Sequence, residues 1–352
     1  MDTKKENIRA FEYDQLVDFF VDHGEKKFRA KQVWEWLWQK SASSFDEMTN
    51  LSKDTRKFLE EKFNIHKVTI AEEQKSNDGT YKLALKLHDE KIVEGVLIPT
   101  SKRTTACISS QVGCSLSCKF CATGRLKRLR NLEAYEMFDQ VAIIKKLAAD
   151  SYDKNLSNIV YMGMGEPLLN YKNMIRSIEM ITSDEGLGMS PRRITVSTAG
   201  IAKAIKRMGD DQSKVNLALS LHAANDEKRD KIMPINESNT LEALADALKY
   251  FHEKTGTRVT YEYIIFKDFN DEIQDARELA EFCKHVPCKV NIIEYNPIDG
   301  GEFQQAEIAK VDAFVDYLES KNIIVNLRRS RGKDIDAACG QLANKNKAAV
   351  AS

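Results

Sequence analysis

The sequence predicts an α/β fold in which repeated strand–helix units build a parallel sheet. From residue 104 onward, short runs rich in Val, Ile and Leu alternate with amphipathic stretches of helical period. With 352 residues, 42% of them hydrophobic, the chain is long enough for one large domain and one small one. Alternating strands and helices favour a parallel sheet joined by crossover helices.

The small domain is expected at residues 1–76. Residues 28–38 carry apolar side chains at helical spacing and include three tryptophans, which we interpret as core, and the helical pattern continues at residues 53–62. The polar, Gly-containing stretch 72–79 breaks the pattern and predicts the domain boundary. Residues 77–100 then alternate as a β-hairpin that links the two domains.

The large domain is expected to contain six strand–helix units, which is fewer than the eight of a closed barrel. The expected strands are residues 105–109, 158–162, 194–198, 215–221, 260–266 and 290–295, with helices at residues 133–149, 173–182, 241–254 and 273–285. Ligands of such folds bind at the carboxyl ends of the strands. The motifs described below follow strands in this way.

Composition narrows the setting in which the protein works. The charged start of the chain predicts no secretory leader, and no run approaches 18 apolar residues, so no membrane span is expected. Seven cysteines at reactive spacing indicate cytosolic metal and thiol chemistry rather than a secreted disulfide framework. The net charge is zero, so a nucleic-acid partner would have to be held by local basic patches. A cytoplasmic location is expected.

Three cysteines, Cys114, Cys118 and Cys121, form a C-x₃-C-x₂-C motif. A 4Fe–4S cluster usually takes four cysteines, so three would leave one iron open to a ligand that is not protein, which indicates catalysis. The alternatives are a zinc site completed by His222 or Cys339, and three thiols that pack as small hydrophobic groups. The spacing, together with the Ala-Thr-Gly that follows, favours the iron–sulfur cluster.

This motif resembles that of the radical S-adenosylmethionine (SAM) enzymes, in which the amino and carboxylate groups of SAM bind the open iron. Over residues 13–342 the chain resembles, more narrowly, the RlmN type of RNA methyltransferase, which methylates C2 of adenine. The resemblance implies a partial (β/α)₆ barrel over residues 101–342, a flexible tail at residues 343–352 and an N-terminal domain that helps to grip RNA. It also implies a 4Fe–4S cluster, two SAM molecules per turnover, a reducing electron donor such as flavodoxin, and a monomer.

A second motif, Met162-Gly163-Met164-Gly165-Glu166-Pro167, directly follows an expected strand. Its glycines let the backbone approach a ligand closely, and the lack of G-x-G-x-x-G makes a dinucleotide site a weak interpretation. The resemblance matches Gly165 and Glu166 to residues that contact the SAM amino group. It implies further SAM contacts at three strand ends: Ser197, Ser220-Leu221-His222 and Asn296. Without it, the serines and the asparagine read as turn formers and His222 as a core residue.

Two more cysteines, Cys107 and Cys339, are catalytic by resemblance, although either alone would be read as a buried thiol. Adenine C2 is electron-poor and the SAM methyl group is an electrophile, so direct displacement would fail. Cys339, as thiolate, would instead accept the methyl group from one SAM. A second SAM would yield a 5′-deoxyadenosyl radical that removes hydrogen from this methyl group, and the resulting methylene radical would add to C2.

Release of the product would need Glu94 and Cys107. Glu94 alone reads as a surface-facing strand residue, but the resemblance matches it to a proton acceptor near the adenine. Cys107 would then attack the sulfur of Cys339, which forms a disulfide and frees the methylated adenine. Cys283 and Cys288 have no part in this scheme and are expected to be structural.

Basic runs at residues 124–130 and 328–333 flank the reactive cysteines and favour an RNA partner, because phosphates supply most RNA affinity. By resemblance the substrates are an adenosine of the peptidyl-transferase centre of 23S rRNA and the adenosine 3′ of the anticodon in tRNA. Two other functions stay open. The Cfr type methylates C8 of the same rRNA adenine, although Pro167 fits the C2 type better. A non-catalytic RNA-binding protein with a redox-sensing cluster would need neither Cys107 nor Cys339.

Overall fold

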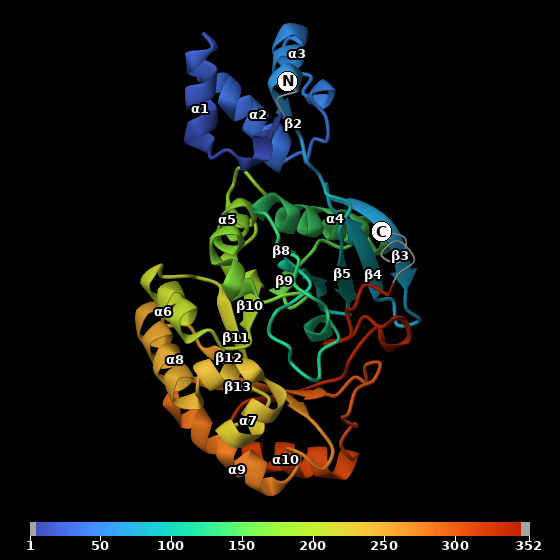
Figure 1. Ribbon diagram of the computed structural model, residues 1–352, viewed down its shortest axis with the longest axis vertical. Coiled ribbons are helices and arrows are strands. Elements are labelled where there is room, and N and C mark those ends of the chain that lie inside the picture. The colour runs from blue at the N-terminus through green and yellow to red at the C-terminus, as the bar shows by residue number, and fades with distance from the viewer. Residues whose placement is uncertain (1–4, 346–352) are drawn as a thin grey trace.

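A ten-stranded sheet forms the centre of the computed structural model, which describes residues 5–345 (Figure 1). Its strand order is β14-β13-β12-β11-β10-β9-β6-β5-β4-β3. The strands from β6 to β14 pair in parallel, so their carboxyl ends meet at one edge. Their bounds are β6 Thr104–Cys107, β9 Asn158–Tyr161, β10 Ile194–Thr198, β11 Asn216–Ser220, β12 Val259–Ile265, β13 Cys288–Glu294 and β14 Val325–Arg328.

Helices cover the outer face of this curved sheet (Figure 1). They are α4 Ala134–Tyr152, α5 Tyr171–Thr182, α6 Ala202–Asp210, α7 Asp226–Ile232, α8 Leu241–Thr255, α9 Ile273–Phe282 and α10 Ile308–Ser320. Helix α8 shows why they form: Leu241, Leu244, Leu248 and Phe251 lie at helical spacing and are buried. Thr240 caps its start by accepting the N–H of Ala243, and it ends at Gly256 in the left-handed conformation.

The expected strands and helices of the large domain are confirmed, with small shifts at their ends. Strand β12 is buried along its whole length, as befits a parallel strand that is covered on both faces. Strand β14 was not predicted. It is short and mostly exposed at the sheet edge, so it lacks the apolar run by which the other strands were found.

The N-terminal unit contains the two helices expected from the sequence, α2 Phe28–Trp38 and α3 Lys53–Lys62, preceded by α1 Tyr13–Asp22. Trp34 and Trp38 are buried, in agreement with their interpretation as core, whereas Trp36 is only partly buried. Trp38 packs edge-on against Phe138 of α4 at 5.1 Å. Beside this contact the buried Arg9 pairs with Asp139 of α4 at 2.7 Å, which fastens the unit to the large domain.

The predicted hairpin is formed by β4 Tyr81–Lys86 and β5 Ile92–Pro99, and it continues the large sheet through the antiparallel pair β5–β6. Strand β3 Thr69–Lys75 was not expected, because these residues were counted with the helical domain. It pairs antiparallel with β4. The boundary after residue 76 therefore stays a prediction, and this pairing favours an earlier one, before residue 69.

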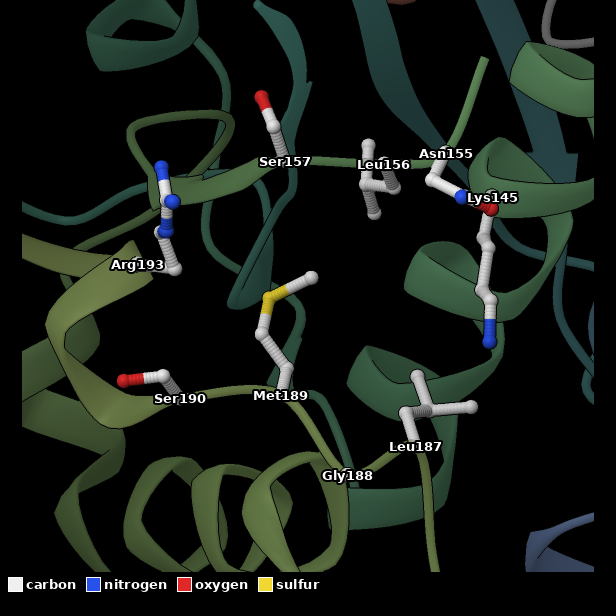
Figure 2. Close-up of a pocket in the computed structure, with 9 residues that line it drawn as sticks. All are labelled: Lys145, Asn155, Leu156, Ser157, Leu187, Gly188, Met189, Ser190 and Arg193. Atoms are coloured by element: carbon white, nitrogen blue, oxygen red, sulfur yellow. The ribbon is translucent and has the colours of Figure 1, made fainter. Parts of the chain in front are cut away.

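A shallow pocket of about 380 Å³ lies at the amino ends of β9 and β10, the end of the sheet opposite to the predicted motifs (Figure 2). Lys145 of α4 and Met189 and Arg193 of the α5–β10 connection face it (Figure 2). None of the predicted site residues lines it. Within residues 5–345, no helix is long and apolar enough to span a membrane.

Candidate active site

The three motif cysteines lie on a loop, residues 113–129, that we call the cluster loop. Its two ends are joined by a small antiparallel pair, β7 Gln111–Val112 with β8 Arg130–Asn131. Gly113 adopts a φ of 77°, and a Cβ there would lie 2.2 Å from the carbonyl oxygen of Lys127. Only glycine fits this close crossing of the loop ends. The loop is therefore closed by its own backbone before any ligand binds.

The three cysteine thiols are neighbours. Burial raises the pKa of Cys114 to about 11, and the nearby Cys121 adds to the increase. Burial also raises the pKa of Cys118, with further contributions from Cys121 and Cys114. Because all three pKa values lie above neutrality, the thiols keep their protons until a metal group binds and displaces them.

The arrangement fits an iron–sulfur cluster better than a zinc ion. Within residues 5–345, no three His, Cys, Asp or Glu side chains come close enough together to hold a single metal ion. His222, the proposed fourth zinc ligand, accepts the backbone N–H of Ile264 with its Nδ1 at 3.1 Å. Three cysteines on one loop would leave one iron of a 4Fe–4S cluster without a protein ligand.

The second motif packs directly against the strand that leads into the cluster loop. Gly165 has a φ of 95°, and a Cβ there would lie 2.5 Å from the Cβ of Gln111. Gln111 accepts the backbone N–H of Glu166 with its Oε1 at 2.9 Å. The Glu166 carboxylate in turn accepts the backbone N–H groups of Leu168 at 3.0 Å and Ala199 at 2.7 Å. Burial raises the pKa of Glu166 to about 7, and these hydrogen bonds oppose the increase.

The other residues predicted to contact SAM lie at the carboxyl ends of β10, β11 and β13. The hydroxyl oxygens of Ser197 and Ser220 are 3.4 Å apart. Asn296 donates through Nδ2 to the carbonyl of Cys339 at 3.3 Å, while its Oδ1 is buried and has no hydrogen-bond partner among residues 5–345. A buried acceptor without a donor is a site for a ligand hydroxyl or amino group, both of which SAM carries. The residues present therefore fit SAM.

His222 behaves as a structural residue at this edge. Burial lowers the pKa of its imidazole to about 3, so the ring is neutral, and its Nδ1 is used by Ile264. Its φ of 56° turns the chain sharply at the end of β11, immediately after Leu221. A contact of Leu221 or His222 with SAM stays a prediction.

The structure brings the two reactive cysteines together. Cys107 ends β6, and burial, followed by the neighbouring Cys339, raises its pKa to about 12. Cys339 lies on the C-terminal loop (residues 329–342), which docks on the cluster loop through Ala122 N–H to the carbonyl of Gly340 at 2.7 Å. Cys339 is exposed to solvent, contrary to the expectation of a buried thiol. The protein packed around its thiol still raises its pKa by desolvation, and Arg328 opposes the increase. Both thiols are free, so no disulfide joins them.

Glu94 is completely buried on β5, the strand that pairs with β6 and its Cys107. Its Oε1 lies 3.8 Å from Nζ of Lys82, and its Oε2 accepts the backbone N–H groups of Ala343 at 2.8 Å and Asn344 at 3.1 Å. Residues 343–345, expected to belong to a flexible tail, are thus hydrogen-bonded or ion-paired in the fold. Residues 346–352 of that tail lie outside the described residues.

Comparison with known proteins agrees with this geometry. Residues 6–65 match the ribosomal RNA large subunit methyltransferase N-terminal domain, and residues 108–282 match the radical SAM superfamily. A relative from Christiangramia forsetii is 58% identical over 343 residues, 97% of each chain. One from Cytophaga hutchinsonii is 59% identical over 342 residues, which cover 97% of this chain and 94% of the relative. Both are named probable dual-specificity RNA methyltransferase RlmN.

The chain belongs to the RlmN family. A crystal structure of a radical SAM methyltransferase from Sphaerobacter thermophilus superposes with a TM-score of 0.90 at 36% identity, covering 96% of this chain and 99% of that one. The expected family and the expected partial-barrel fold are therefore confirmed. Radical SAM enzymes use a 4Fe–4S cluster and SAM, which agrees with the three cysteines and the residues around them.

Only some of the cations in the two basic runs of this RlmN family member are available to bind RNA. Several of their cations already bind within the protein: Arg125 to the carbonyls of Asp299 and Gly300, Arg130 to Asp89 and Glu136, Arg331 to Asp78, and Lys333 to Glu294. Lys127, Arg128 and Arg329 make no ion pair with a carboxylate in the described part of the chain. Arg328 makes no such ion pair either, but its charge acts on Cys107 and Cys339. Lys127, Arg128 and Arg329 are therefore the candidates for contact with RNA.

Three residues that support the candidate site of this RlmN family member were not predicted from the sequence. Gln111 supports Gly165 and Glu166 across 55 positions of sequence. Arg328 was read only as part of an RNA-binding run, yet its charge favours the thiolate forms of both Cys107 and Cys339 and so lowers their pKa values. Arg229, in a charged and exposed-looking helix sequence, is fully buried beneath the strand ends. No local pattern distinguishes these residues from ordinary polar ones.

Proposed function

We propose that this radical SAM RNA methyltransferase methylates C2 of adenine, with Cys339 as the carrier of the methyl group. The observation that supports this is the docking of the C-terminal loop on the cluster loop. It places Cys339 within electrostatic reach of both Cys107 and Cys121. A methyl acceptor, a resolving thiol and a cluster ligand thus meet at one edge of the sheet.

Cys114, Cys118 and Cys121 would hold the 4Fe–4S cluster, and Gly165, Glu166, Ser197, Ser220 and Asn296 would surround SAM. When bound, the cluster and SAM supply the one-electron chemistry that yields a 5′-deoxyadenosyl radical able to take hydrogen from a methyl group on Cys339. The Glu166 carboxylate is held rigidly by two backbone N–H groups and fits a cationic amino group. Two SAM molecules per turnover follow from the two different uses of SAM.

Cys339 must become a thiolate to accept the first methyl group. Its pKa is raised by desolvation, and Arg328 is the charge that opposes this. Cys107 is protonated at neutral pH, since its pKa is about 12. It would lose this proton when it attacks the sulfur of Cys339. The new S–S bond would replace the bond from that sulfur to the carbon attached to C2, and this carbon would keep the electron pair and take up a proton to become the methyl group.

Glu94 is the proposed acceptor of the C2 proton. Its carboxylate is held by Lys82 and by the N–H groups of Ala343 and Asn344. These contacts fix the orientation of the carboxylate, and a carboxylate fixed in this way can serve as a general base. For an adenine to reach it, residues 343–344 would have to move aside. Binding of RNA would supply the free energy for this displacement.

The proposed substrates are the adenosine of the 23S rRNA peptidyl-transferase centre and the adenosine 3′ of the anticodon in tRNA. The dual-specificity names of the relatives support both. These RNAs are found in the cytoplasm, so we propose that the enzyme acts there. A reducing electron donor such as flavodoxin would supply its electrons. A monomer stays a prediction.

The decisive experiment is anaerobic incubation of the cluster-reconstituted protein with a reductant, SAM and RNA. We expect 5′-deoxyadenosine and 2-methyladenosine from the wild type, and no methylated RNA from Cys339→Ala, although this variant keeps its iron. Mass spectrometry that finds the methyl group on C8 would support the Cfr type instead. Intact SAM in the wild type under reduction would support a redox-sensing RNA-binding protein.

RNA contact is tested separately by charge reversal. Arg128→Glu and Lys127→Glu should each weaken RNA binding and lower the salt dependence of log K by about 0.7–0.9 per lost phosphate contact. Arg331→Glu is the matched control, because Arg331 is already paired with Asp78. If all three variants bind RNA like the wild type, the basic runs are not the RNA site.

A further inference from the structure

Arg229 of α7 ties together two of the strand ends that surround the SAM site. It is fully buried. Its Nε donates to the carbonyl of Leu221 at 3.1 Å, and its Nη2 donates to the carbonyls of Ala199 at 2.6 Å and Ser220 at 3.2 Å. Its Nη1 donates to Oδ1 of Asn236 at 2.6 Å. One planar guanidinium thus bridges the carboxyl ends of β10 and β11.

The charge of Arg229 has no direct counter-charge among the residues that the structure describes. No carboxylate among residues 5–345 forms an ion pair with it, and Asp226 and Asp230 reach it only through Asn236, which donates to both at 2.8 and 2.7 Å. A buried cation is normally paired, as Arg9 is with Asp139 at 2.7 Å. Desolvation lowers the pKa of Arg229 to about 10, so it nevertheless keeps its charge at neutral pH.

A negatively charged group bound at the cluster loop would lie close to Arg229 and would balance its charge. Cys118 precedes Lys119 on the cluster loop and lies within electrostatic range of Arg229, so a thiolate at Cys118 would favour the charged guanidinium. The helix of Arg229 also touches the cluster loop directly, since Lys119 N–H donates to the carbonyl of Ile232 at 3.0 Å. Once Cys118 is a thiolate bound to a cluster, negative charge lies beside this cation. A fixed buried cation stabilises the more negative, reduced form of such a group most.

We propose that Arg229 is a positioning residue of the radical site: it holds the SAM-binding strand ends in register and raises the reduction potential of the cluster bound by Cys118. This role rests on the proposed function, because it requires a cluster at Cys114, Cys118 and Cys121. It also explains why a cation is buried without a carboxylate. The charge is balanced only when the protein is loaded.

The test compares Arg229→Gln with Arg229→Lys in the full-length, anaerobically reconstituted protein. The midpoint potential is measured by redox titration followed by electron paramagnetic resonance, and SAM affinity by equilibrium dialysis. Arg229→Gln should shift the reduction equilibrium at least tenfold toward the oxidised cluster, or about 59 mV for one electron. Arg229→Lys should keep the potential but bind SAM more weakly, because an ammonium group does not span three carbonyls in a plane.

Arg207→Gln is the matched control. Arg207 lies on α6 and is exposed, and its guanidinium contacts Asp211 at 3.9 Å and the ring of Tyr171 at 4.3 Å. None of these groups belongs to the proposed site, so neither the potential nor the SAM affinity should change. An unchanged potential in Arg229→Gln, or an equal shift in Arg207→Gln, would overturn the proposal. A wild type that takes up no cluster would instead refute the proposed function.

A second variant, Asp230→Asn, tests the same proposal if Arg229→Gln does not fold. Asp230 is exposed, so its replacement is tolerated, and loss of its charge leaves Arg229 less compensated. The reduction potential of the cluster should then rise. The rise should be smaller than the fall expected for Arg229→Gln, because solvent screens the charge of Asp230. An unchanged or lower potential in Asp230→Asn overturns the role of the Arg229 charge.

Discussion

Replacement of Gly165 by alanine tests whether backbone geometry creates the SAM site. At a φ of 95°, an alanine is strained by about 1–2 kcal/mol relative to glycine. Its Cβ would also overlap Gln111, with contacts of 2.5 Å to Cβ and 2.7 Å to Cγ. Gln111 must then move, which removes the acceptor of the buried Glu166 N–H at a cost of about 1–3 kcal/mol. We expect Gly165→Ala to lower the free energy of unfolding by roughly 2–5 kcal/mol in total.

Gly188→Ala is the matched control for this prediction. Gly188 has a φ of 62°, but nothing lies within 4 Å of the position of its Cβ, and it borders the pocket at the opposite end of the sheet (Figure 2). It should therefore lose only the conformational part, about 1–2 kcal/mol. Urea unfolding of the cluster-free chains measures both. In the loaded protein, SAM affinity should fall roughly 5- to 150-fold for Gly165→Ala alone, which corresponds to the additional 1–3 kcal/mol. Equal unfolding free energies and equal SAM affinities in the two variants would refute the reasoning.

Three further outcomes are expected. Cys107→Ala should accumulate a covalent RNA–protein adduct, visible as a shifted band on a denaturing gel, because no thiol releases Cys339; free methylated RNA at the wild-type rate would contradict this. Glu166 has a folded-state pKa raised to about 7, so its contribution to stability is complete below about pH 4.5 and is lost as the pH rises through 7. The free energy of unfolding of the cluster-free protein should therefore fall by up to about 3 kcal/mol across this window, and Glu166→Gln, followed by urea unfolding at several pH values, should flatten the fall. Arg9→Met and Asp139→Asn should each cost about 3–5 kcal/mol by leaving a buried charge unpaired, while the double variant should cost clearly less than the sum, as a double-mutant cycle by urea unfolding would show.

The fold was predicted from local patterns of apolar residues in the sequence. The six strands of the large domain, from β6 to β13, are apolar runs between helices, and burial on both faces makes such runs visible in the sequence. Strands β3 and β14 were missed because edge strands expose alternate or most residues and so resemble polar loops. A local pattern also predicted helix α2, because its tryptophans lie at helical spacing. Trp34 and Trp38 are buried in the core as predicted.

The sequence by itself determined the cluster loop and the glycine motif, because the spacing of three cysteines and two glycines is a local property that survives in any correct fold. Only the tertiary structure decided which distant groups meet. It brought Cys339 to Cys107, placed the backbone of residues 343–344 on Glu94, and set Arg229 under the SAM-binding strand ends. It also paired Arg130 and Arg331 with carboxylates of the protein, whereas Lys127, Arg128 and Arg329 make no ion pair among residues 5–345. The physical reason is that a side chain's partners and burial depend on how strands and loops pack across hundreds of residues, and neither periodicity nor composition records that packing.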